Sequence, residues 1–246
     1  MKFQQRLKRV IDVSLAAFIL VFASPFLLLV MLLIWILEGR PIFYISRRHV
    51  TADRTIPIFK FRTMVRDAKD PKYRLKERFM KDGYLDIPRT CEVYTPIGRF
   101  LERVQIVEVP QMINVIFHGM SLIGNRPLPA ENVQLLKKYP NWSARFESPA
   151  GITGLAQVVG KIRLSPEQRL GLEAAYSRRY QRGDIILCDA FIFFSTLAVI
   201  FLSLNVPVET AYSLIRTGEP ENRTDESEAP SGASGAPAVS KFETTA

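Results

Sequence analysis

Residue types that most often carry chemistry are scarce in this chain. Its 246 residues include two cysteines and two histidines. Cys91 and Cys188 lie far apart with no histidines clustered beside them, so neither a disulfide framework nor a zinc site is expected. We interpret His49 and His118 as structural or surface groups rather than as general bases. The chemistry of this chain is therefore expected to rest on its charged side chains.

The balance of charge is strongly basic. Lysine and arginine number 33 against 24 acidic residues, which gives a net charge of +9. Such a chain can bind nucleic acid, but the sequence carries no zinc-finger, RNP or basic-zipper signature. Many of its cations instead flank an apolar segment near the N-terminus. Anionic lipid headgroups and phosphorylated substrates explain the charge better, and no nucleic acid partner is expected.

One apolar segment near the N-terminus is long enough to enter a membrane. Residues 10–37 hold a single charge, Asp12, and exceed the roughly 20 apolar residues that cross a bilayer. A cleaved signal peptide has a shorter apolar region, of about 7 to 15 residues, followed by small residues. Residues 35–42 offer no such cleavage site. We expect the segment to be retained and to contact membrane lipids.

Positive charges on both flanks of this segment indicate its topology. By the positive-inside rule, both flanks favour the cytosol. Ser24 and Pro25 lie near the middle, where proline removes a helix hydrogen bond and serine can satisfy a freed carbonyl. These features predict a re-entrant helical hairpin; an ordinary span with a tolerated kink is the alternative. The flanking cations are Lys2, Arg6, Lys8 and Arg9 before the segment and Arg40, Arg47, Arg48, Arg54, Lys60, Arg62 and Arg66 after it.

The central part of the chain combines short β-prone pieces with helical patterns. Residues 40–64 contain two such pieces bounded by charged turns, and residues 69–89 form a charged insertion, helical or loop. Residues 96–117 carry apolar positions at helical spacing, interrupted by Pro110. This pattern predicts two helices that meet near residues 105–109.

Two further helices are predicted towards the C-terminus. Ser165 is a candidate N-cap followed by proline, and Gly183 is a candidate C-cap. Residues 185–204 are strongly apolar and long enough to span a membrane, and they could equally lie in the interface or pack on the domain. We expect a helix that lies at the membrane or packs beside it. Beyond Arg216 the polar, proline-rich composition predicts disorder.

These segments predict one domain with membrane attachments. The expected divisions are a basic N-terminus over residues 1–9, a re-entrant membrane helix over 10–38, a globular domain with a C-terminal membrane-associated helix over 39–208, and a disordered tail over 209–246. The expected fold class is α+β. A membrane helical hairpin precedes a mostly helical cytosolic domain that carries a small β element and amphipathic helices.

Four ordered motifs resemble those of the bacterial sugar transferases. These are the monotopic polyprenol-phosphate phosphoglycosyl transferases that begin assembly of capsules, O-antigens and glycoproteins. The resemblance covers residues 7–205 and favours the re-entrant course of the N-terminal segment. The motifs are KRVIDVSLA followed by Ser24-Pro25, then PIFYISRRHVTADRTIPIFKFRTM, then EVPQMINVIFHGMSLIGNRPLP, and finally PAGITGLAQV.

The resemblance implies a protein of the bacterial inner membrane whose globular part faces the cytosol. Family members move a sugar-1-phosphate from a UDP-sugar to undecaprenyl phosphate. An aspartate attacks the β-phosphate to form a phosphosugar-enzyme intermediate, and the neighbouring glutamate helps to hold Mg²⁺. The polyprenol phosphate then displaces the sugar phosphate from the enzyme.

Carried over position by position, the resemblance implies several site residues. Glu108 matches the metal-binding glutamate, although it also suits the first turn of a helix as an acid. Arg126 matches a phosphate-binding arginine, and Lys60 and Arg62 match cations of the same kind. For these three cations, a solvated or lipid-facing charge is the alternative. The glycines of the GITGLAQ run are expected to serve backbone geometry.

The sequence departs from the family where the chemistry is expected. Val107 occupies the position of the nucleophilic aspartate, and an isopropyl group cannot attack phosphorus. The Gly-Asp-Met-Ser run of the family is His-Gly-Met-Ser here, and two family glycines are replaced by Val50 and Asp53. Asn125 replaces a proline in the Gly-Pro-Arg-Pro run. Together these changes indicate a relaxed demand for the chemistry.

Three functions therefore stay open. The first is a transferase that uses another route, with Glu108 as nucleophile or with a direct displacement on the pyrophosphate. The second is a pseudoenzyme that acts as partner, scaffold or regulator of an active sugar transferase. The third is a lipid-binding or transport accessory protein. Exposed apolar helices also suit an oligomer with itself or with a related transferase, and no motif names the sugar.

Overall fold

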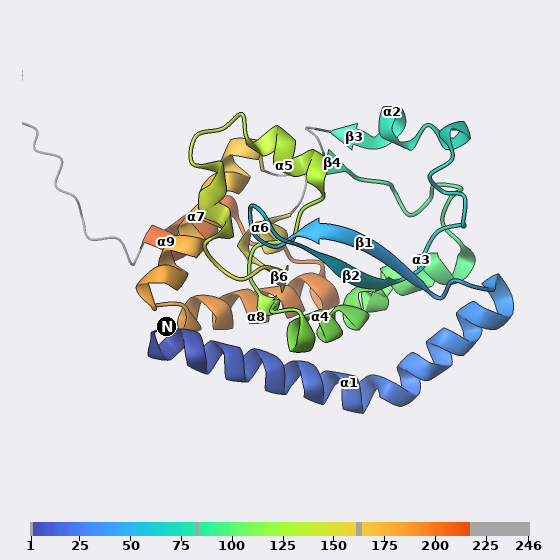
Figure 1. The fold of residues 1–246 in the computed structure, drawn as a ribbon, viewed down its shortest axis with the longest axis horizontal. Helices are drawn as coiled ribbons and strands as arrows, with labels where there is room; N and C mark the ends of the chain where they lie inside the picture. The colour runs from blue at the N-terminus through green and yellow to red at the C-terminus, as the bar shows by residue number, and fades with distance from the viewer. Residues whose placement is uncertain (1, 82–83, 161–163, 217–246) are drawn as a thin grey trace, which may run out of the picture.

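A long N-terminal helix lies along a small mixed domain (Figure 1). The computed structural model describes residues 2–81, 84–160 and 164–216, and the predicted disorder beyond Arg216 lies outside these residues. In chain order the elements are α1 (Phe3–Glu38), β1 (Phe43–His49), β2 (Thr55–Phe61), η1 (Pro71–Tyr73), α2 (Leu75–Phe79), β3 (Met80–Lys81), β4 (Tyr84–Leu85), α3 (Pro96–Arg103), η2 (Ile106–Gln111), α4 (Met112–Phe117), β5 (Ser121–Ile123), α5 (Ala130–Leu136), η3 (Trp142–Phe146), β6 (Gly151–Thr153), α6 (Leu155–Val159), α7 (Pro166–Arg182), α8 (Ile186–Leu202) and α9 (Val208–Arg216).

Helix α1 is continuous and bent rather than divided into two helices (Figure 1). Pro25 lies inside it and has no N–H to donate to the carbonyl of Val21, four residues earlier. Ser24 Oγ donates to that same carbonyl at 2.7 Å. The serine therefore supplies the hydrogen bond that the proline removes, which lets an apolar helix continue through the bend.

The first turns of α1 are attached to the end of α7. Lys2 Nζ donates to the carbonyl of Arg182 at 2.6 Å, and Gln5 Nε2 donates to the carbonyl of Tyr180 at 2.8 Å. Carbonyls at the end of a helix lack intrahelical partners and attract a cation. The N-terminal end of the apolar helix is therefore bound to the globular part.

A set of buried polar side chains joins α1 to β5, α7 and α8. Lys8 Nζ donates to Asp189 Oδ2 at 2.6 Å and lies 3.3 Å from Asp12 Oδ2. Ser121 Oγ donates to Asp12 at 2.5 Å, and the Tyr176 hydroxyl donates to Asp189 Oδ1 at 2.8 Å. We call these five residues the buried cluster, because the side chains of its lysine and two aspartates are 4%, 7% and 12% exposed.

The far end of α1 is held by Arg62, which directly follows β2. One Nη of Arg62 donates to the carbonyls of Glu38 and Gly39, each at 3.0 Å. Its side chain is 7% exposed and lies 3.5 Å from the Glu38 carboxylate. Both ends of α1 are therefore attached to the same globular part.

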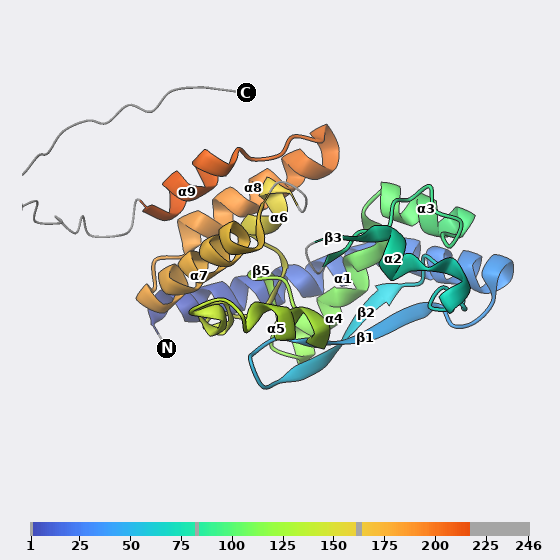
Figure 2. The ribbon, with the colours of Figure 1, turned by 90° about the horizontal axis from the view of Figure 1, so that it is seen from above.

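The two β-prone pieces predicted over residues 40–64 form an antiparallel hairpin, which confirms that prediction. Strands β1 and β2 pair from Phe43 opposite Phe61 to His49 opposite Thr55. Figure 2 shows this hairpin with α2 and α3 at one end of the molecule and α7, α8 and α9 at the other. Helix α1 runs beneath both ends.

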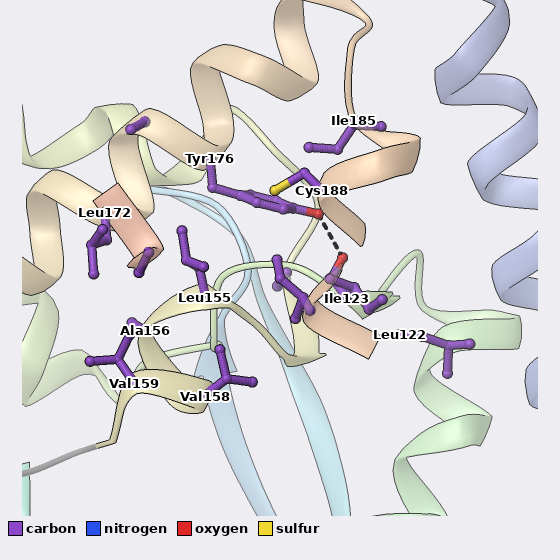
Figure 3. Close-up of a cluster of buried hydrophobic side chains, with 14 of the residues drawn as sticks. Leu122, Ile123, Leu155, Ala156, Val158, Val159, Leu172, Tyr176, Ile185 and Cys188 are labelled. Atoms are coloured by element: carbon purple, nitrogen blue, oxygen red, sulfur yellow. Dashed lines mark hydrogen bonds between the residues drawn. The ribbon is translucent and has the colours of Figure 1, made fainter. Parts of the chain in front are cut away.

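A large hydrophobic cluster packs α6, α7 and α8 against the short parallel pair β5 and β6 (Figure 3). The Tyr176 hydroxyl donates to the carbonyl of Ile123 at 3.0 Å within it. A Cβ added at Gly151 would lie 2.1 Å from the backbone nitrogen of Gly124, so the pair can approach only with glycine there. This confirms the expected structural role of the glycines in the GITGLAQ run.

The predicted helices near the C-terminus are present. Ser165 caps α7 by accepting from Gln168, and Gly183 ends it with a φ of 81°. Helix α8 buries Cys188, Asp189 and Ile192 against the domain, which was the alternative to a helix held by the membrane alone. Its other face leaves large apolar side chains exposed.

Residues 209–216, which the predicted boundaries place in the disordered tail, are helical. Residues 208–216 form α9, whose Ala211 and Ile215 are 0% and 4% exposed. An amphipathic face that packs against α7 and α6 explains why this segment folds despite the polar composition that follows it.

Large exposed apolar side chains are numerous on α1 and α8. Among the described helices, α1 alone is long and apolar enough to cross a membrane, and 17% of its most apolar window is buried. The strongly exposed members are Val21, Phe22 and Leu37 of α1, Phe117 of α4, and Leu187, Phe194 and Phe201 of α8. Exposed apolar side chains in such number suit contact with a membrane or with another protein.

Candidate functional site

Three charged side chains from separate elements meet beside the hairpin. Lys60 Nζ on β2 donates to Glu108 Oε1 at 2.5 Å. Arg126, in the loop after β5, donates from Nη1 to Glu108 Oε2 at 3.2 Å and from Nη2 to Glu108 Oε1. Both oxygens of the carboxylate therefore accept from cations. We call Lys60, Glu108 and Arg126 the open cluster, because their side chains are 21%, 28% and 28% exposed.

Local backbone geometry explains why these three residues converge. Gln105 adopts a φ of 59° between α3 and η2 and is the N-cap of η2. Glu108 lies in the first turn of η2. Element η2 packs against β2, the strand of Lys60. A separate parallel bridge between Asn125 and Ala150 holds the chain directly before Arg126. The sequence analysis named all three residues, and the structure brings them together.

Burial and the neighbouring charges shift the pKa values of all three residues of the open cluster. Burial acts to raise the pKa of Glu108, but the charges of Arg126 and Lys60 outweigh it and hold that pKa well below the ordinary value of 4.5. The Glu108 carboxylate raises the pKa of Arg126. Burial lowers the pKa of Lys60, and the charge of Arg126 acts in the same direction. Glu108 is therefore ionised at neutral pH.

Arg48 adds a further cation that sequence reasoning counted only as flanking charge. In the hairpin register Arg48 is opposite Ile56 and Lys60 is opposite Tyr44, so the two cations share one face of the strands. Burial lowers the pKa of Arg48, and its charge interacts with those of Arg126 and Glu108. The alternation of side chains between the two faces of β1 was the sequence signal that could have placed Arg48 on the same face as Lys60.

Val107 directly precedes Glu108 in the sequence, but its side chain packs among apolar side chains and does not contact the open cluster. It is 5% exposed and belongs to a hydrophobic cluster between α1, β2, α3 and η2. The other buried members are Leu27, Val30, Ile34, Phe61 and Leu101. At this position the side chain contributes to the docking of α1 on the domain.

Arg62 is not among the contacts of the open cluster, although the resemblance implied that it binds phosphate. Its guanidinium donates to the carbonyls of Glu38, Gly39 and Arg40 at the end of α1. The contacts of Arg62 therefore serve the attachment of α1. Ser24 and Pro25 likewise act within α1 and not at the open cluster.

The loop that carries Arg126 rests on a buried network that sequence reasoning missed. Asn125 Nδ2 donates to the carbonyls of Arg145 and Glu173 and to Ser177 Oγ, at 2.8, 2.9 and 3.0 Å. Arg145 pairs with Glu173 at 2.6 Å and donates to the carbonyl of Arg126 at 2.9 Å. The departure from proline at residue 125 thus provides an amide that supports the loop.

A protein-bound Mg²⁺ does not fit the open cluster in this arrangement. Mg²⁺ prefers near-octahedral oxygen ligands and usually takes one or two carboxylates together with substrate phosphates. The single carboxylate of the open cluster already accepts from Lys60 and Arg126 at both oxygens. Glu102, whose charge reaches Arg126, accepts instead from Thr63 at 3.4 Å. Across residues 2–81, 84–160 and 164–216, no three His, Cys, Asp or Glu side chains gather closely enough to hold a metal.

Comparisons with known proteins support the family that the motifs indicate, and the match to the family profile covers most of the chain. The bacterial sugar transferase profile matches residues 3–203. The exopolysaccharide production protein ExoY of Sinorhizobium fredii is 30% identical over 208 residues, which is 80% of this chain and 86% of that protein. The uncharacterized sugar transferase EpsL of Bacillus subtilis is 31% identical over 170 residues, 69% of this chain and 77% of EpsL.

A longer relative has a name that states a reaction. The UDP-glucose:undecaprenyl-phosphate glucose-1-phosphate transferase of Escherichia coli is 32% identical over 155 residues, which is 63% of this chain and 31% of that protein. The match to the family profile covers both the open cluster and the apolar N-terminal helix. The chain therefore belongs to the bacterial sugar transferase family.

Proposed function

We propose that this protein binds a UDP-sugar and undecaprenyl phosphate in exopolysaccharide biosynthesis and has lost the covalent step of its family. The open cluster is the observation that carries the proposal, because it presents Lys60 and Arg126 with part of their surface accessible. Lysine and arginine are the side chains that pair best with phosphate oxygens. The names of the relatives support the two substrates and the pathway.

Loss of the covalent step follows from residues 107 and 108. The isopropyl group of Val107 has no lone pair, and its apolar packing holds it in place. Glu108 is a weak nucleophile here because its oxygens accept from two cations and its pKa is lowered. In this proposal the protein acts as a substrate-binding partner, scaffold or regulator of an active sugar transferase.

The proposal places α1 in the inner membrane as a re-entrant segment with both ends on the cytosolic side. At about 1.5 Å per residue, its 36 residues would extend roughly 54 Å, more than the roughly 30 Å core of a bilayer. An ordinary span would put the ends of α1 on opposite faces. One of the attachments made by Lys2 and Arg62 would then be broken.

A second candidate function is direct transfer without an enzyme-bound sugar phosphate. The cations of the open cluster favour it, since phosphoryl transfer depends mainly on positioning and on neutralising charge. An oxygen of undecaprenyl phosphate would attack the phosphorus that carries the sugar. The bond from that phosphorus to the bridging oxygen would break, and UMP would leave with this oxygen.

Binding and turnover measured on one sample separate these functions. We would place the full-length protein in nanodiscs, titrate a panel of UDP-sugars calorimetrically, and then measure UMP release with undecaprenyl phosphate present. The proposal predicts binding without UMP release above that of empty nanodiscs. It also predicts that Lys60→Gln weakens binding at least tenfold, whereas Lys72→Gln, at an exposed cation paired with Asp67, does not.

Two results would redirect the assignment. Steady UMP release by the native protein, lost in Arg126→Gln, would replace the proposal with direct transfer. Absence of UDP-sugar binding by a correctly folded sample would favour a lipid-binding accessory protein. Far-UV circular dichroism of each variant would show that folding is intact.

A further inference from the structure

We propose that the open cluster binds the diphosphate of its ligand without a divalent cation, and that Glu108 is an internal anion that the ligand displaces. This inference rests on the proposed function, because it specifies how the same site takes its ligand. It reverses the role that the family resemblance implies for Glu108, from metal ligand to competitor for the cations.

The contacts of Glu108 are those of a bound anion. One oxygen accepts from Lys60 and Arg126, and the other accepts from Arg126. A carboxylate and a phosphate present oxygens of similar spacing, and an arginine fork binds either of them through paired N–H groups. The carboxylate therefore occupies the donors that a phosphate would use.

The charges of the site suit a diphosphate once Glu108 moves aside. Arg48, Lys60 and Arg126 are cations, and among the described residues Glu108 is the one acid that pairs with the last two. The diphosphate of a UDP-sugar carries one negative charge on each phosphate. The cations can neutralise these charges directly, which is the task that Mg²⁺ performs in sites where acids predominate.

A metal would meet unfavourable partners at this carboxylate. Three of the four lone-pair positions of the Glu108 carboxylate accept from Lys60 and Arg126, so a divalent cation would either displace one of these groups or bind beside both positive charges. Glu102 is the next acid, and its own contact is with Thr63. Releasing Glu108 to solvent requires less rearrangement, because its side chain is 28% exposed.

The inference gives Glu108 an opposite effect on binding from the one expected of a metal ligand. Removing the charge of Glu108 should leave its cations free for the ligand and tighten binding. If Glu108 held a metal that binds the ligand, the same substitution would weaken binding. The native protein should also bind equally well with the metal chelated.

The test is a calorimetric titration of UDP-glucose into the full-length protein in nanodiscs, with either EDTA or excess Mg²⁺. We expect dissociation constants within about twofold in the two buffers, and at least fivefold tighter binding by Glu108→Gln in EDTA. Glu77→Gln is the matched control, because Glu77 is an exposed acid paired with Arg74 and should leave the constant unchanged. Uridine, which lacks the phosphates, should show no response to Glu108→Gln.

Each other result has a distinct meaning. Binding that requires Mg²⁺ and is lost in Glu108→Gln would overturn this inference and leave the proposed function standing. Binding in EDTA that Glu108→Gln weakens would overturn the role of an internal anion. Absence of binding in both buffers would overturn the proposed function and this inference together. Because the first comparison uses only the native protein, it holds even if the variant fails to fold.

Discussion

The two charged clusters of this protein differ in the exposure of their side chains and in the sign of their net charge. In the buried cluster one lysine faces two aspartates, Lys8 with Asp12 and Asp189, and the side chains are at most 12% exposed. In the open cluster two cations face one carboxylate, and the side chains are 21% to 28% exposed. The buried cluster has every charge enclosed, whereas the open cluster has spare positive charge at the surface.

This difference separates attachment from binding. Hydroxyls of Ser121 and Tyr176 complete the hydrogen bonds of the buried aspartates, so that cluster has no donor left for a ligand. It ties α1 to α8 near the start of the apolar segment. The side chains of the open cluster are partly exposed, and a ligand can reach them. Charge alone therefore does not indicate a binding site; excess charge with access to solvent does.

The largest expected effect is on folding, at Lys8. Lys8→Met would leave two buried carboxylates without their cation, and breaking a buried ion pair in this way costs about 3–5 kcal/mol. Urea denaturation in detergent micelles, followed by circular dichroism, measures the loss. Lys72→Met removes an exposed cation, 53% exposed, and should change stability by less than about 1 kcal/mol. Equal effects of the two variants would contradict the distinction between buried and exposed pairs.

A smaller loss is expected at Val107. Val107→Asp would bury a carboxylate in apolar packing against α1, and we expect a cost of at least about 2 kcal/mol. Val104→Asp is the matched control, because Val104 is 36% exposed and should tolerate the charge. The same denaturation experiment compares them. A fully stable Val107→Asp protein would show that this side chain can turn towards the open cluster.

The smallest effect is a pH dependence of stability due to Glu108. Because Arg126 and Lys60 overcome the effect of burial, the pKa of Glu108 is lower in the folded protein than in the unfolded chain. The unfolded state therefore binds the proton more readily, so the stabilisation is present above about pH 4.5 and is lost as pH falls through the folded pKa. The stability difference between native protein and Glu108→Gln should shrink between pH 5 and pH 3. A difference that grows on acidification would contradict the lowered pKa.

Much of the fold follows from local sequence patterns. The hairpin, the capped helix α7 and the apolar helix α8 were predictable, because turn residues, the caps Ser165 and Gly183 and runs of apolar residues act locally. Helix α9 was missed because its stability comes from burying Ala211 and Ile215 against distant helices. The meeting point near residues 105–109 is confirmed as a junction, where η2 lies between α3 and α4.

The candidate site was only partly predictable. Lys60, Glu108 and Arg126 came from motifs, but nothing in their spacing showed that Glu108 pairs with both cations. Arg62 matched a motif equally well, yet it binds the end of α1. Contacts between residues far apart in sequence decide which cation serves a ligand and which serves a helix.

The central claim is that the open cluster binds its ligand without forming a covalent sugar phosphate. The most direct measurement is intact-protein mass spectrometry after incubation with a bound UDP-sugar and no lipid acceptor, with UMP quantified in the same sample. The account predicts an unchanged protein mass and no UMP. A mass increase of one sugar phosphate with stoichiometric UMP, both abolished in Glu108→Gln but not in Glu77→Gln, would contradict it and identify Glu108 as the nucleophile.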